Sequence, residues 1–252
     1  SGDHQWLDKI MESPYNMATR IIVPFDVIEA YKSKPLGNLA LKAHRFVVEW
    51  TAVTHIILPS SLTDLRFVNS SAECTEAVSD TTIQGLPRSL LHLHIPNQSL
   101  ITSKCIPDLP NQLLTLKIDG RNVSDSALRH LPATLTELTI LDGTHGSNAS
   151  ELKFPPNLKL LHLLVDRSSG VENWFSDEHV QALPRSLEDL RVDHSTKLTA
   201  NAFAQIPRSV TKLHLNCPHI YDFDPADLPP GLTSFSATPN CALDGALKQR
   251  RV

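Results

Sequence analysis

The stretch Leu86-Pro87-Arg88-Ser89-Leu90-Leu91-His92-Leu93-His94-Ile95 reads as L-P-x-x-L-x-x-L-x-L, and the same pattern returns along the chain. Eight copies begin at Leu58, Leu86, Leu109, Leu131, Phe154, Leu183, Ile206 and Leu228. Their starts are 22 or 23 residues apart, except for gaps of 28 residues after Leu58 and 29 residues after Phe154. A period of this length predicts a solenoid, in which each repeat packs only on its neighbours.

Within each copy, the final L-x-L alternates apolar and variable residues, which predicts a short strand with both apolar side chains turned inward. The proline near the start of the copy fixes its own φ and ends whatever precedes it. Single helical turns are expected before three of the prolines, with Ser124, Ser176 and Thr199 as N-caps. The predicted fold is an α/β solenoid of about eight parallel strands with short helical or irregular convex segments.

The L-P-x-S-L-x-x-L phrase is similar to FNIP-type repeats, although the Phe-Asn pair that names those repeats is absent. Residues 123–132 and 198–207 resemble the repeats of F-box leucine-rich proteins. The resemblance covers residues 55–240 and implies a leucine-rich-repeat fold, which hosts many different binding roles. The asparagine that closes the loop after each strand in the standard repeat is mostly missing. We therefore expect less regular turns here.

Residues 1–54 precede the repeats and are expected to form a helical cap over the first of them. An apolar stripe of Leu39, Ala43, Phe46, Val47 and Trp50 predicts a helix over residues 36–50. At the other end, residues 241–252 are expected to form a C-terminal cap or tail.

A second interpretation of the N-terminal segment comes from its resemblance to a degenerate F-box. That helical module docks a Skp-type adaptor of cullin ubiquitin ligases. The resemblance implies these adaptor-binding residues: Pro24, Phe25, Ile28, Pro35, Leu36, Leu39 and Trp50. Val23 stands where the family has its leading Leu, and the middle apolar positions need a shift of about one residue.

The net charge, the apolar runs and the motifs of the sequence exclude several classes of function. A formal net charge of −4 predicts no nucleic-acid partner, and no apolar run approaches the ~20 residues of a membrane span. The sequence has none of the common catalytic or phosphate-binding motifs, so no catalytic residue and no cofactor are predicted. His92 and His94 share a strand face, but their spacing alone does not predict a metal site.

Localisation is predicted to be cytoplasmic because the four cysteines have no metal-ligand or framework spacing. A secreted or cell-surface location is the alternative. It rests on glycosylation sequons at Asn69, Asn97, Asn122 and Asn148.

Strand alternation also predicts which residues line the open, concave face of the solenoid. The candidate partner-binding residues are His92, His94, Lys117, Glu137, Leu141, Leu160, His162, Leu164, Asp189, Arg191, Asp193, Lys212 and His214. Leu141, Leu160 and Leu164 would form an exposed apolar cluster beside a mixed-charge patch, as contact surfaces do. Trp174 and Phe175, in the second long gap, would either contact a partner or pack beneath their own loop.

The sequence thus predicts a non-catalytic protein–protein interaction module that binds a protein partner on the concave face. The narrower version is an F-box-type substrate receptor of a cullin ubiquitin ligase. The alternative is a secreted or surface module that binds a receptor or glycan. The histidines of the face further predict that affinity changes between about pH 5.5 and 7.5.

Overall fold

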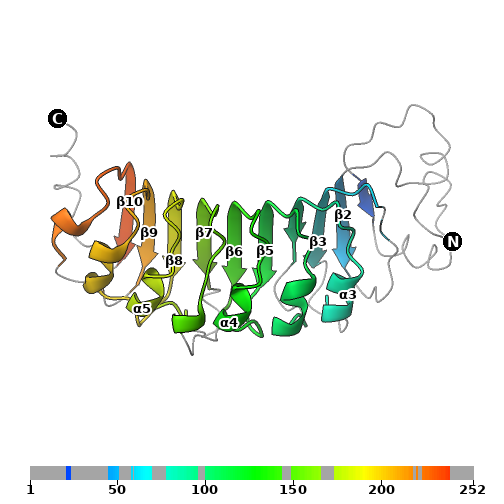
Figure 1. The fold of residues 1–252 in the computed structure, drawn as a ribbon, viewed down its shortest axis with the longest axis horizontal. Helices are drawn as coiled ribbons and strands as arrows, with labels where there is room; N and C mark the ends of the chain where they lie inside the picture. Colours follow the sequence, from blue (N-terminus) through cyan, green and yellow to red (C-terminus); the bar gives the residue numbers. More distant parts are fainter. Residues whose placement is uncertain are drawn as a thin grey trace. The chain divides into compact units, whose positions relative to one another are not determined.

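The computed structural model describes residues 21–23, 45–50, 58, 60–69, 78–95, 100–143, 149–165, 173–217, 220 and 223–238. The chain has two compact units, unit 1 (Ser1–Ile118) and unit 2 (Asp119–Val252). In Figure 1 the strands of each unit lie side by side, and the short helices gather on one side of them.

Unit 1 contains five parallel strands among its described residues: β1 (Ile21–Val23), β2 (Arg45–Trp50), β3 (Asp64–Asn69), β4 (His92–His94) and β5, which begins at Thr115 and ends just beyond the unit at Asp119. Helix α3 (Asp80–Gln84) and the 3-10 helix η2 (Ser103–Asp108) connect successive strands.

Unit 2 repeats the arrangement with β6 (Glu137–Leu141), β7 (Leu160–Leu164), β8 (Asp189–Asp193), β9 (Lys212–Asn216) and β10 (Ser234–Thr238), all parallel. Its connections hold α4 (Asp125–Leu128), η3 (Ala149–Glu151), α5 (Asp177–Val180), η5 (Ala200–Gln205) and η6 (Pro225–Asp227). The predicted order of strand, loop, short helix and proline is confirmed. Ser124, Ser176 and Thr199 are N-caps as expected.

The leucines of the motif form the core. In the second copy, Leu90, Leu93 and Ile95 are at most 1% exposed. The same positions are buried in the other copies as far as Leu215, whereas Leu232 and Phe235 of the last copy are half-buried. Since each fully buried leucine contributes about 1.5–3 kcal/mol, four per repeat are enough to define the fold.

The proline does more than end the preceding helix. Its carbonyl accepts a hydrogen bond from the amide three residues later, as Pro87 does from Leu90 at 3.3 Å and Pro184 from Leu187 at 3.1 Å. The same turn recurs at Pro110, Pro132, Pro155, Pro207 and Pro229. Each of these seven copies therefore uses one proline to stop a helix and to start the turn that leads into the next strand.

The prediction of a helix through Trp50 is wrong for residues 45–50. Arg45–Trp50 is strand β2, and it pairs in parallel with β3, with Phe46 opposite Leu65 and Val48 opposite Phe67. Strand β2 thus covers the edge of the first repeat. This pairing satisfies the backbone N–H and C=O groups that an unpaired edge strand would leave without partners. Residues 24–44 lie outside the described part of the chain, as do 239–252, which include the predicted C-terminal tail.

Candidate protein-binding face

Strands β3 to β10 have one buried face and one open face, and we call the open face the strand face. In unit 1 it contains two rows of registered residues: Asp64, His92 and Thr115 in one, and Arg66, His94 and Lys117 in the other. In unit 2 one row holds Glu137, Leu160, Asp189, Lys212 and Ser234, and the next holds Thr139, His162, Arg191, His214 and Ser236. These are the rows that strand alternation predicted.

Most of the charges on the strand face of unit 2 are paired. The Asp189 carboxylate lies 3.2 Å from His162 Nε2 and 3.8 Å from Lys212 Nζ. At the other end of β8, Asp193 lies 3.0 Å from Arg191 Nη2 and 3.8 Å from His214 Nε2. Each aspartate therefore lies between two basic side chains, so the predicted mixed-charge patch exists as two ion-paired groups.

The apolar part of the patch is smaller than predicted. Leu160 and Leu164 are half-buried, and His162 stands between them on β7. Leu141 is only 9% exposed, so its predicted place in an exposed cluster is wrong. Asp193 is likewise buried, at 8%.

The burial of Leu141 and Asp193 has a local cause. Both end their strands, and in β6 and β8 the last two residues are buried in succession because the chain is already bending into the turn. The next residues, Asp142 and His194, take positive φ values of 50° and 56°. Asparagine, aspartate and histidine tolerate that conformation better than most residues.

Trp174 and Phe175 pack beneath their own segment, since Trp174 is 5% exposed and Phe175 is fully buried. Asn173 holds this segment in place. Its side-chain amide donates to the carbonyls of Leu163 and Asp193, at 3.1 and 3.0 Å, and its Oδ1 accepts from the Phe175 amide. The two aromatic residues are therefore core, and they are not contact residues.

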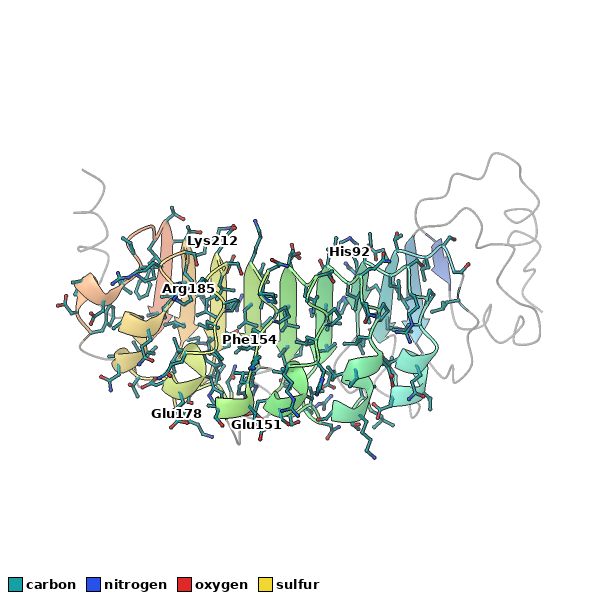
Figure 2. The ribbon with its side chains drawn as sticks, viewed as in Figure 1. His92, Glu151, Phe154, Glu178, Arg185 and Lys212 are labelled. Carbon is teal, nitrogen blue, oxygen red and sulfur yellow. The ribbon has the colours of Figure 1, made fainter. Side chains whose placement is uncertain are left out.

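The strand face of unit 1 has a different electrostatic character. His92, which Figure 2 labels, is partly exposed, as are His94 and Lys117, and Arg66 is exposed beside His94. Burial lowers the pKa of His94 to about 4, with Lys117 and Arg66 adding to the effect. His94 is therefore neutral throughout the pH range in which the sequence predicted a change of affinity.

His214, in unit 2, also has a lowered pKa, chiefly through burial and then through Arg191. For His94, whose pKa lies below the predicted pH range, a pH response requires a ligand that raises that pKa.

Sequence reasoning left two residues of unit 1 out of the candidate set. Arg66 belongs to the row of His94 and Lys117 by register. Leu114, just before β5, is 36% exposed. A signal was available for Leu114, because the matching positions of most other copies hold polar residues: Thr63, Thr136, Lys159, Glu188, Thr211 and Thr233.

The two described cysteines, Cys105 and Cys217, are free and buried. Burial raises the pKa of Cys105 to about 12 and that of Cys217 to about 11, so neither thiol is ionised near neutral pH. Among the described residues, no group of three or more His, Cys, Asp or Glu side chains could hold a metal ion. No helix in the same ranges is long and apolar enough to cross a membrane.

The adaptor-binding residues expected from the F-box resemblance are largely untested. Pro24, Phe25, Ile28, Pro35, Leu36 and Leu39 lie outside the described residues. Trp50 is the last residue of strand β2.

No protein-family model matches the sequence, and a search of curated proteins found no match. Among solved structures, the chain is similar to the leucine-rich repeat-containing protein LegL7 from Legionella pneumophila, with 14% identity and a TM-score of 0.41 over 78% of this chain and 73% of that one. It is also similar to CroV588, described as a circular leucine-rich-repeat protein, with 19% identity and a TM-score of 0.40 over 80% of this chain and 38% of that one. The stacked parallel strands, with short helices and proline turns between them in the described ranges, have the fold of a leucine-rich-repeat solenoid.

Proposed function

We propose that this protein is a non-catalytic interaction module that binds a protein partner on its strand face, the side predicted to be concave. One observation carries the proposal: Leu160 and Leu164 lie half-exposed on β7, with paired charges on the two strands that follow. An apolar centre with a polar rim is the usual anatomy of a protein interface. The interface centre would be Leu160, His162 and Leu164.

The ion pairs of unit 2 support recognition of a folded or extended protein segment over a small molecule. The side chains of Asp189 and Asp193 are largely covered, whereas those of Lys212 and His214 are 63% and 41% exposed. Such rim charges set orientation and association rate more than affinity. Most of the affinity would come from burying Leu160 and Leu164.

The experiment is affinity capture with the intact chain from extracts of its source, followed by quantitative mass spectrometry. Leu160→Ser/Leu164→Ser is compared with Gln181→Ser, which changes an exposed residue at the end of α5, away from the strand face. We expect the double variant to lose its partner at least tenfold while Gln181→Ser keeps it. Equal capture by both variants would refute the proposal.

A narrower form adds a Skp-type adaptor at residues 21–50, which would make the protein a substrate receptor of a ubiquitin ligase. Its support is the sequence motif from Pro24 to Trp50. Strand β2 counts against it, because an F-box is helical and residues 45–50 are extended. Co-purification with a recombinant adaptor, lost on Pro24→Ala or Leu39→Ala, would support this form, and the absence of a complex at micromolar concentration would exclude it.

The alternative is a secreted or cell-surface recognition module that binds a receptor or glycan. The observation in its favour is that Asn122, in the sequon Asn122-Val123-Ser124, is exposed. Occupied sequons would add mass to the protein isolated from its source. An unmodified mass would leave the cytoplasmic location as the proposal.

A further inference from the structure

The strand face of unit 1 carries a short row of cationic and imidazole side chains. Arg66 of β3 pairs in register with His94 of β4, which pairs with Lys117 of β5. Neighbouring strands are about 4.8 Å apart, so the outer two positions are separated by about 10 Å at the backbone. The three side chains lie on one face because they occupy the same register position.

The two cations of this row are unpaired among the described side chains. Among the described residues, neither the Arg66 guanidinium nor the Lys117 ammonium lies within ion-pair distance of a carboxylate or makes a side-chain hydrogen bond. The basic residues of the corresponding unit 2 rows differ, since His162, Arg191, Lys212 and His214 each have an aspartate. The same scaffold can thus place acids beside cations of the strand face, and at this row no described side chain supplies one.

We propose that this row binds an acidic segment of the partner protein, with carboxylates at Arg66 and Lys117 and a hydrogen bond from the His94 ring between them. This inference rests on the proposed function, because it names the chemistry of the segment that the strand face receives. The guanidinium of Arg66 can take a carboxylate through two parallel hydrogen bonds, whereas Lys117 offers a point charge.

The surroundings favour a segment with spaced carboxylates over a nucleic acid. Asp64 stands two residues before Arg66 on β3, and the chain has a net charge of −4, so a dense run of phosphates meets repulsion. In an extended peptide, alternate side chains lie about 6.7 Å apart on one side. Two acidic residues separated by one or two others therefore reach both cations through the long side chains of Arg66 and Lys117.

The protein is expected to take up a proton when the acidic segment binds. The charged and titratable groups around His94 are Asp64 and Arg66 on β3, His92 on β4 and Lys117 on β5, and the register also places Arg45 and Glu49 of β2 diagonally beside Arg66. A bound carboxylate opposes the effect of the two cations and raises the pKa of His94 in the complex. Because the complex then holds more protons than the free protein, affinity rises as pH falls from about 7 towards 5.

The direct test uses the full chain and labelled peptides in fluorescence anisotropy at low salt. The probes are a Glu-Ser repeat peptide, a Lys-Ser repeat of the same length, and oligo-dT of the same charge as the Glu-Ser peptide. We expect the Glu-Ser peptide to bind, and Arg66→Gln/Lys117→Gln to weaken its binding at least tenfold. Lys104→Gln is the matched control, since Lys104 is exposed on η2, away from the strand face.

A second variant tests the role of His94. His94→Gln keeps a polar side chain that cannot titrate, and we expect it to remove most of the gain in affinity between pH 7.5 and 5.5. Equal effects of Lys104→Gln and Arg66→Gln/Lys117→Gln, or tighter binding of oligo-dT than of the Glu-Ser peptide, would overturn the inference.

Capture of the natural partner separates this inference from the proposed function. If Leu160→Ser/Leu164→Ser loses the partner while Arg66→Gln/Lys117→Gln retains it fully, the strand face binds but the acidic-segment inference is wrong. If neither variant loses the partner, the proposed function itself fails.

Discussion

Asp177 of α5 joins its repeat to the next one through Thr199. One carboxylate oxygen accepts the Thr199 backbone amide at 2.7 Å and the other accepts the Thr199 hydroxyl at 2.6 Å. In unit 1, Asp80 and Thr102 make the same two contacts, both at 2.7 Å. In each case the partners are 22 residues apart, which is one repeat. The helix side of the solenoid is thus joined by polar bridges, as the strand side is by backbone pairing.

The two hydrogen bonds between Asp177 and Thr199 predict that substitutions at these residues have strongly non-additive effects on stability. In a double-mutant cycle of Asp177→Ala and Thr199→Val, we expect a coupling free energy on the order of 1–3 kcal/mol, because hydrogen bonds to charged groups are the stronger ones. Urea unfolding measures it. The same cycle at Asp80 and Thr102 is the matched test in unit 1, and additive effects at both sites would contradict the bridge.

Gly120 is predicted to be intolerant of any side chain. A Cβ there would overlap Ile140 Cγ2 and lie 2.9 Å from the Cα of Gly143, so the turn after β5 has no space for it. We expect Gly120→Ala to lower the free energy of unfolding by about 1–3 kcal/mol through overpacking.

Gly231→Ala is the control for this prediction. Nothing lies within 4 Å of a Cβ at Gly231, so the change should be within about 0.5 kcal/mol of neutral. Similar unfolding midpoints for the two variants would show that Gly120 is not closely packed.

His179 is predicted to make unit 2 acid-sensitive. Its side chain is buried, and its Nε2 lies 3.6 Å from Asp125 Oδ2, too far for a hydrogen bond. Burial lowers the pKa of His179 and outweighs the opposing effect of Asp125. Just below pH 6.5, His179 therefore binds protons more readily in the unfolded chain than in the folded one. As a result, the free energy of unfolding decreases as pH falls from there towards the folded-state pKa of His179.

His179→Gln should reduce this acid dependence. Glutamine can still accept the Ser176 amide, which His179 Nδ1 accepts at 3.0 Å, but it cannot take up a proton near neutral pH. We expect the variant to be less stable at pH 8, because it loses ring contacts with Trp174. Between pH 7.5 and 5, its free energy of unfolding should fall by on the order of 1 kcal/mol less than that of the unmodified protein. His130→Gln is the exposed control, and equal slopes for the two variants would argue against His179.

The two buried thiols offer a separate measure of unfolding in each unit. Cys105 lies in unit 1 and Cys217 in unit 2, and each is at most 1% exposed. Neither should react with iodoacetamide at pH 8 in the native protein, and each should become labelled when its own unit opens in urea. Peptide mapping by mass spectrometry distinguishes them, and rapid native labelling of either would contradict the packing described here.

The repeat predicted the core well because burial of its leucines depends only on the pattern. Leu90, Leu93 and Ile95 occupy the apolar positions of the repeated motif, and all three are buried as the motif predicts. The helix expected through Trp50 was wrong because Arg45–Trp50 fits two periods. Phe46, Val47 and Trp50 suit a helical stripe, but Phe46 and Val48 also alternate, and pairing with β3 selects the strand.

The strand face was predictable in its rows but less so in its exposure. Alternation placed Leu141 on the open side, yet the chain turns there and buries it. Nor could spacing show that Asp189 and Asp193 would pair with four basic side chains, while Arg66 and Lys117 have no charged partner among the side chains that the structure describes. Those differences depend on side-chain geometry across strands that are a repeat apart in sequence.

The central claim, that a partner binds the strand face, is tested most directly by labelling histidines with diethyl pyrocarbonate in the free protein and in the captured complex. His92, His94, His162 and His214 lie on that face, whereas His130 is exposed after α4 on the other side. We predict that the complex protects at least His162 and His214 of unit 2, with His92 and His94 of unit 1 protected by an acidic segment, while His130 labels as before. Protection of His130 with unchanged labelling of the four strand-face histidines would contradict the account.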